Sequence, residues 1–136
     1  MAGSFQIVSR LRAFARRDQG SATIEAVIWL PIFIMMFCFA ADAALIFAKQ
    51  AEVMRVVQDA NRAMSIGRLM TAADTQTYIQ SRIGTISPAA QIVTTVSGGV
   101  IATTVTMPSS DLTATGFISA LTNINVSVTS QHMSEA

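Results

Sequence analysis

The stretch that decides the fold is residues 16–48, which read RRDQGSATIEAVIWLPIFIMMFCFAADAALIFA. No charged residue occurs over residues 26–41. If Asp42 is allowed, the apolar run continues beyond it and exceeds the roughly 20 residues that a helix needs to cross a bilayer. The insertion cost of Asp42, about +3 kcal/mol or less, does not outweigh the surrounding Val, Ile, Leu and Phe residues. The sequence therefore predicts a membrane-spanning helix over about residues 26–48.

The composition agrees with a membrane protein and excludes several classes of function. Of the 136 residues, 51% are hydrophobic and 12% are charged, which is unusual for a soluble domain. A net charge of +1 argues against a nucleic-acid partner, because phosphate binding needs excess basic residues. The single cysteine, Cys38, lies within the apolar run, where a thiol packs as a small hydrophobe. His132 has no Cys, Asp or Glu at metal-ligand spacing, so we expect no metal and no cofactor.

Two local features flank and interrupt the predicted span. Residues 1–20 form a basic leader, with four arginines against a single acid, Asp18. Pro31 lies one turn into the span, where it removes a backbone donor and predicts a helix kink. Such a break is tolerated in lipid because neighbouring groups can satisfy the freed backbone.

Beyond Lys49 the pattern becomes amphipathic, which predicts that the helix leaves the membrane and continues. Apolar residues recur at helical spacing, and charged residues occupy the opposite face. The apolar stripe comprises Val53, Val56, Val57, Ala60 and Met64, and the charged face comprises Arg55, Asp59 and Arg62. Gly67 is the predicted stop. A helix over residues 21–67 would be roughly 70 Å long at 1.5 Å per residue.

Residues 68–136 predict a small α+β domain. A short helix is expected over residues 72–83, ending at Gly84. Gly98-Gly99 predicts a two-residue hairpin turn between β-branched runs. The turn fixes the register, so that the pairs are Ser97 with Val100, Val96 with Ile101, Thr94 with Thr103 and Ile92 with Val105. One face of the hairpin would then collect all four large aliphatic residues of these pairs.

A third strand is predicted over Ile124 to Gln131, where apolar and polar residues alternate. Three strands with one apolar face need a cover, and the stripe from Val53 to Met64 supplies it. The predicted fold is therefore α+β, with a long N-terminal helix packed at its C-terminal half on a small antiparallel three-stranded sheet.

The order of residues between the leader and the span is informative about function. Gly20 and Ser21 follow the arginines, and Glu25 stands at the start of the apolar run, where an acid is costly without a partner. A helix N-terminus, which favours anions, would account for part of this placement. The arrangement resembles the class III signal of type IV prepilins. That resemblance implies cleavage between Gly20 and Ser21 by a prepilin peptidase, and pairing of Glu25 with the new ammonium of a neighbouring subunit.

A narrower resemblance covers about residues 20–67. The segment from Gly20 to Pro31, the acid at Asp42 and the later stretch VQDANRA, residues 57–63, look like the TadE-like family. These proteins are minor pilins or pseudopilins of the tight-adherence (Tad/Flp) type IV pilus system and its secretion apparatus. Glu25 is followed by Ala26 rather than the tyrosine common in Flp major pilins, and the chain is longer than those pilins. Both differences favour a minor component with a type IV pilin-like fold.

The resemblance implies partners and a location. The partners would be a prepilin peptidase, other pilins or pseudopilins, Tad inner-membrane assembly proteins and membrane lipid. The chain would cross the bacterial inner membrane once, with its N-terminus in the cytoplasm and its C-terminus in the periplasm. Incorporation into an extracellular pilus would be compatible with this location. The charge count alone is a tie, since Lys49, Arg55, Arg62 and Arg68 follow the span. The less neutralised leader arginines favour the same topology.

Two alternatives share parts of this pattern. A membrane-anchored binding protein that never polymerises would have the same architecture. A Sec signal peptide cleaved after Ala43, at the sequence Ala41-Asp42-Ala43, would release a soluble periplasmic protein. The long charge-free run and the presence of Glu25 disfavour that signal. No serine, threonine or carboxylate has a catalytic partner at recognisable spacing, so we do not expect an enzyme.

Overall fold

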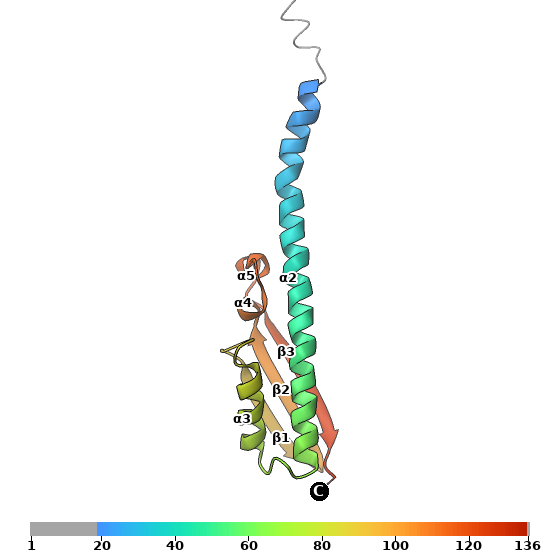
Figure 1. The fold of residues 1–136 in the computed structure, drawn as a ribbon, viewed down its shortest axis with the longest axis vertical. Coiled ribbons are helices and arrows are strands. Elements are labelled where there is room, and N and C mark those ends of the chain that lie inside the picture. The colour runs from blue at the N-terminus through green and yellow to red at the C-terminus, as the bar shows by residue number, and fades with distance from the viewer. Residues whose placement is uncertain (1–18, 136) are drawn as a thin grey trace, which may run out of the picture. The chain divides into compact units, whose positions relative to one another are not determined.

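The computed structural model describes residues 19–135, with the side chains of residues 23–135. The chain separates into two compact units, Met1–Phe37 and Cys38–Ala136. The elements are α2 (Gln19–Ser65), α3 (Ala72–Ile83), β1 (Gln91–Ser97), β2 (Val100–Pro108), α4 (Ser109–Leu112), α5 (Phe117–Leu121) and β3 (Asn125–Met133) (Figure 1). The predicted α+β class is confirmed. Most of the predicted basic leader lies outside the described residues.

Helix α2 is continuous over 47 residues, and the division between the two units falls within it. Its C-terminal end has the geometry expected of a glycine stop. Gly67 has φ 73°, a conformation that glycine adopts without strain. The Arg68 N–H donates to the Ala63 carbonyl at 2.8 Å, and the Gly67 N–H donates to the Met64 carbonyl at 3.0 Å. These two bonds form a Schellman motif that ends the helix.

The short helix α3 occupies the predicted residues 72–83. A capping box begins it, in which the Thr71 hydroxyl accepts from the Asp74 N–H at 3.0 Å and the Asp74 carboxylate accepts from the Thr71 N–H at 3.1 Å. Ile79 and Ile83 are fully buried, so the thin apolar stripe of the sequence is sufficient to dock the helix.

The sheet has the order β1-β2-β3, and both pairings are antiparallel. All four hairpin pairs predicted from Gly98-Gly99 occur in β1 and β2. Both glycines have positive φ, 58° and 77°, as a tight two-residue turn of this kind requires. The predicted third strand is confirmed, although it begins at Asn125. Ile124 lies just outside it, because its N–H donates to the Thr122 carbonyl at 3.1 Å and its opposite residue, Ser109, already begins α4.

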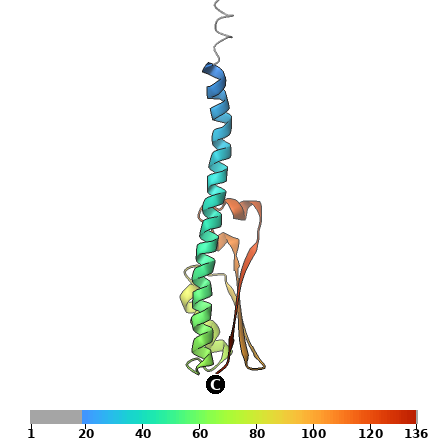
Figure 2. The same cartoon turned by 90° about the vertical axis from the view of Figure 1, so that its right-hand side faces the viewer.

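Within the second unit, the part of α2 that follows Cys38 packs with α3 on one face of the sheet, which makes two layers (Figure 2). The predicted cover is therefore confirmed, since Val53, Val57 and Ala60 are fully buried. The four large aliphatic residues of the predicted apolar face do share one face of the hairpin, but they are not equally buried. Val96 lies on that face but is 52% exposed, because it borders an open groove beside Met70. The remaining core residues include Ile101, Val105, Met107, Leu112 and Val128.

A polar residue of α2 also faces the sheet. Asn61 is fully buried, its Oδ1 accepts from the Thr103 hydroxyl at 2.7 Å, and its Nδ2 donates to the Ser130 carbonyl at 3.0 Å. The Thr103 hydroxyl also lies 3.0 Å from that of Thr94, so the network reaches all three strands. Asn61 thus fixes the position of α2 along the strands of the sheet, which the aliphatic stripe alone does not specify.

We expect Asn61→Ala to lower the free energy of unfolding by about 2–3 kcal/mol, because it leaves the Thr103 hydroxyl and the Ser130 carbonyl without their buried partner. Denaturant unfolding of the full chain in detergent, followed by circular dichroism, measures this loss. Gln58→Ala is the matched control, since Gln58 is exposed on the same helix and should change stability by less than about 0.5 kcal/mol. Equal effects of the two substitutions would contradict the role of Asn61.

Candidate membrane and assembly segment

The residues of α2 before Asp42 present a broad apolar surface that the described part of the chain leaves exposed. Large side chains along this surface are 44–68% exposed. They are Ile24, Val27, Ile28, Trp29, Leu30, Ile32, Phe33, Ile34, Met35, Met36, Phe37 and Phe39. Soluble monomers rarely expose a contiguous apolar surface of this size, so the surface requires lipid or other apolar helices. Among the helices of the described residues, α2 is the one that is long and apolar enough to cross a membrane.

The residues of the predicted signal lie at the start of this helix. Gly20 and Ser21 lie in the first turn of α2, which begins at Gln19. Glu25 is exposed, and within residues 23–135 its carboxylate has no hydrogen bond or ion pair. Because residues four apart lie on the same side of a helix, Glu25 is one turn beyond Ser21 on the same side. The segment thus places an acid that has no partner within residues 23–135 one turn from the predicted new N-terminus.

Pro31 lies inside α2, and the helix continues on both sides of it. The ring of Trp29 lies near that of Phe33, with centroids 6.2 Å apart and planes tilted by 44°. These two aromatic side chains share one side of the helix, whereas Pro31, two residues from each, lies on the other side. The predicted kink at Pro31 stays a prediction.

Asp42 is the polar residue whose role the sequence did not reveal. Its side chain is 0% exposed, although apolar residues surround it in the sequence. The carboxylate accepts five hydrogen bonds, all from the segment around α5. Their donors are the N–H groups of Ala114 (3.1 Å), Thr115 (2.8 Å), Phe117 (2.8 Å) and Ile118 (3.2 Å) and the hydroxyl of Thr115 (2.7 Å).

This cluster balances the charge of Asp42 without a cation. The donors include N–H groups at the start of α5, which a helix otherwise leaves without acceptors and which carry partial positive charge. Gly116 makes the geometry accessible, since its φ of 71° turns the chain so that the N–H groups on both sides of it converge on the carboxylate. The donors lie 72–76 residues from Asp42 in the chain, so no local pattern could have predicted this contact.

A second polar contact holds the same segment further along α2. Lys49 Nζ donates to the Asp111 carbonyl at 2.9 Å. The Asp111 carboxylate in turn accepts from the Ser87 hydroxyl at 2.7 Å. Lys49 therefore binds α4 to α2 through Asp111, and Asp42 binds the start of α5 to α2.

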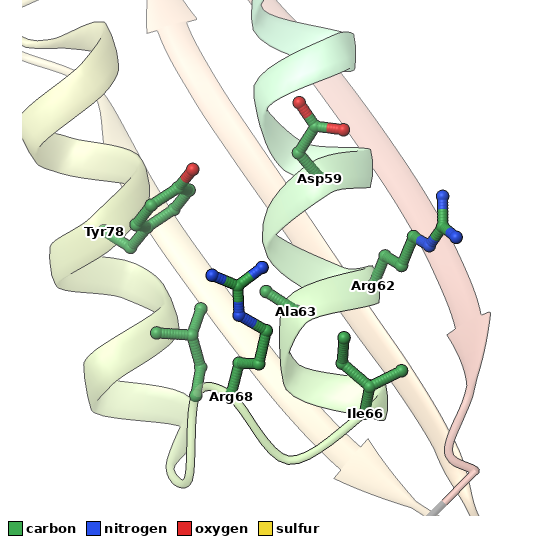
Figure 3. Close-up of a pocket in the computed structure, with 7 residues that line it drawn as sticks. Asp59, Arg62, Ala63, Ile66, Arg68 and Tyr78 are labelled. Carbon is green, nitrogen blue, oxygen red and sulfur yellow. The ribbon is translucent and has the colours of Figure 1, made fainter.

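A cleft of about 470 Å³ lies at the other end of the second unit, between the C-terminal end of α2 and α3. Arg68, from the connecting loop, extends into the space between the two helices, whereas Arg62 points away from α3 (Figure 3). Asp59 and Tyr78 also line the cleft, and the guanidinium of Arg82 lies 5.3 Å from the Tyr78 ring centroid. The cleft combines cationic groups with one carboxylate. Within residues 19–135 no cluster of His, Cys, Asp or Glu has the arrangement of a metal site.

Comparison with known proteins agrees with the family resemblance over the helix. Residues 20–62 match the family model described as TadE-like protein. The predicted resemblance to this family is thus confirmed for a segment that includes Gly20, Glu25, Asp42 and Asn61. No curated protein and no solved structure matches the chain.

We expect Asp42→Ala to release the segment around α5 from α2 while the sheet stays folded. The amide protons of residues 114–118 should then exchange with a local opening free energy near zero, because they lose their acceptor. Hydrogen–deuterium exchange of the full chain in detergent measures this change, and Asp59→Ala, an exposed acid of the same helix, is the control. Unchanged exchange at residues 114–118 would show that the carboxylate does not hold them.

Proposed function

We propose that the chain is a minor pilin or pseudopilin, a structural subunit of Tad/Flp pilus assembly or of its secretion apparatus. The observation that carries this proposal is the coincidence of the TadE-like match with an uncovered apolar helix that begins with Gly20, Ser21 and Glu25. The match relates this helix to proteins of Tad pili, a family that is structural rather than catalytic. The apolar surface gives such a subunit the means to pack among other helices.

In this proposal a prepilin peptidase cleaves between Gly20 and Ser21. Cleavage there removes the basic leader and creates an ammonium at Ser21, in the first turn of α2. Glu25 supplies the opposite charge one turn away, either to its own Ser21 or to that of a neighbouring subunit. A neighbour is favoured, because two apolar helices packed in lipid gain little from hydrophobic association and depend on packing and polar pairs.

The proposal includes a topology with the leader in the cytoplasm and the small α+β domain, residues 68–136, exported to the periplasm. One apolar segment near the N-terminus fits a single-pass anchor in the inner membrane. The peptidase, the other pilins or pseudopilins and the Tad inner-membrane assembly proteins would then meet the chain at the membrane. Uptake of the subunit into an extracellular pilus is compatible with this arrangement.

The contacts of Asp42 argue against a signal peptide cleaved after Ala43. Such cleavage would remove the carboxylate that accepts five hydrogen bonds from residues 114–118. Four backbone N–H groups would lose their acceptor, which is costly where they are buried. Cleavage after Gly20 instead leaves every described contact of the second unit in place.

We expect the mature chain to begin at Ser21. Mass spectrometry of the protein isolated from membranes of cells that carry the pilus system measures its N-terminus directly. A chain that begins at Ala44 would contradict the proposal in favour of Sec processing, and an intact Met1 would indicate a plain membrane anchor. Gly20→Ala tests the site itself, since the substitution should leave the leader attached, whereas Gln58→Ala, at an exposed position of the same helix, should be processed normally.

We expect Glu25→Ala to be inserted and processed but to assemble poorly. Without the carboxylate, the ammonium at Ser21 has no partner in the helix bundle. Loss of the pair should reduce crosslinking to other pilus subunits roughly tenfold, which corresponds to about 1.4 kcal/mol. Glu52→Ala is the matched control, because Glu52 is an exposed acid of the same helix. Normal crosslinking of Glu25→Ala would instead favour an anchored protein that does not polymerise.

A further inference from the structure

The apolar run of α2 continues on both sides of Asp42. At 1.5 Å per residue, roughly 20 residues are needed to cross the hydrocarbon core, which is about 30 Å thick. Counted from Ala26, the first residue after Glu25, a span of that length ends near Leu45. Asp42 would then lie within the outer part of the hydrocarbon or at its boundary with the headgroups. A carboxylate at that depth is costly unless it is paired or hydrogen-bonded.

The structure supplies those hydrogen bonds from the segment 113–124. Because Asp42 is fully buried beneath residues 114–118, these residues must lie at the same depth as Asp42. The segment is also able to enter an apolar environment, since most of its N–H groups have acceptors, either the Asp42 carboxylate or the carbonyls of residues 109–122. Ala120 donates to the Gly116 carbonyl at 2.9 Å, and Thr122 donates to the Ile118 carbonyl at 2.9 Å.

The composition of this segment is that of an interfacial element. No charged residue occurs over residues 112–124. Ile118 packs inward and is 8% exposed, whereas Leu121 is 65% exposed and Ile124 is 48% exposed. The cleft between α2 and α3, at the far end of α2, is lined instead by Asp59, Arg62 and Arg68. The segment 112–124 thus differs from the far end of the second unit in lacking charged residues, although apolar side chains such as Ile66, Met70 and Val96 are exposed at that end too.

We propose that the segment 113–124 lies in the membrane surface, with Leu121 and Ile124 in contact with the acyl chains just below the lipid headgroups. The proposal rests on the membrane location proposed for α2. Lipid is the expected occupant of this surface because residues 114–118 are bonded to Asp42, which lies within the predicted membrane span of α2. Lys49, one turn beyond Leu45, has a long side chain that bonds to Asp111 and keeps its charge on the water side of this boundary.

Site-directed spin labelling of the full chain in phosphatidylcholine–phosphatidylglycerol nanodiscs tests the proposal. Cys38→Ser removes the single cysteine, and Leu121→Cys then carries the label. Collisions with oxygen, which concentrates in lipid, are compared with collisions with a water-soluble nickel chelate. We expect the label at residue 121 to be accessible to oxygen and shielded from nickel. Gln80→Cys, an exposed position of α3, is the control and should show the reverse.

Each outcome decides between named surroundings. Nickel accessibility at residue 121 equal to that at residue 80 would place the segment in water and overturn the proposal. Shielding from both reagents would mean contact with protein, such as a second copy, and would also overturn it. Ile124→Cys provides an independent reading should the label at residue 121 disturb the local fold. Met35→Cys distinguishes failure of this proposal from failure of the proposed function. If the label at residue 35 lies in lipid and the label at residue 121 lies in water, only the proposal for the segment 113–124 is refuted.

Discussion

One helix has to satisfy two different surroundings, and the rest of the structure follows from how it does so. Between residue 23 and Asp42, the side chains of α2 are mostly apolar and exposed, whereas after Asp42 the same helix contributes to the core of a folded domain. Asp42 marks the change. Its carboxylate cannot remain bare beside apolar residues, and five hydrogen bonds from the region of α5 remove that difficulty. The domain is therefore attached to α2 at Asp42, although Phe47 beyond it is still 69% exposed.

The aliphatic contacts of α2 supply burial, and its polar contacts supply position. Val53, Val57 and Ala60 are small and similar, so a shift of the helix by one turn would still bury apolar surface. Asp42, Lys49 and Asn61 each have partners at fixed places in the domain, and such a shift would leave these partners unpaired. Buried polar groups are expensive when unsatisfied. The polar contacts, spread over five turns of α2, thus select one register of helix on sheet.

The parts of this fold that were predictable depend on local rules. Gly98-Gly99 sets the hairpin register through turn geometry, and the spacing of Val53, Val57 and Ala60 identifies the face that covers the sheet. The C-terminal end of α3 was predicted from Gly84, which directly follows the helix. The region of α4 and α5 had no comparable signal, because its helices have 4 and 5 residues. Such short helices have no periodicity to detect, and they depend on tertiary contacts for their stability.

The candidate site divides in the same way. Gly20, Ser21 and Glu25 were recognisable because charge, glycine, acid and apolar run follow one another in the sequence. Asp42 was recognisable as an acid in the apolar run, but its partners lie more than 70 residues away. Most of them are backbone N–H groups, which occur at every non-proline residue and therefore leave no signal in the sequence. Exposure of Val96 was also missed, since turn geometry says which face a residue occupies but not whether the covering helix extends over it.

The internal satisfaction of Asp42 has a consequence for assembly. A subunit that moves from lipid into a bundle of helices exchanges the surroundings of residues 23–41, while the bonds of Asp42, Lys49 and Asn61 remain unchanged within the second unit. The apolar surface gains little from that exchange, because lipid and neighbouring helices are similarly apolar. Glu25 is the one charged residue in that stretch, and it has no partner among the described residues. Its pairing is therefore the electrostatic term that differs between a subunit alone in the bilayer and a subunit within an assembly.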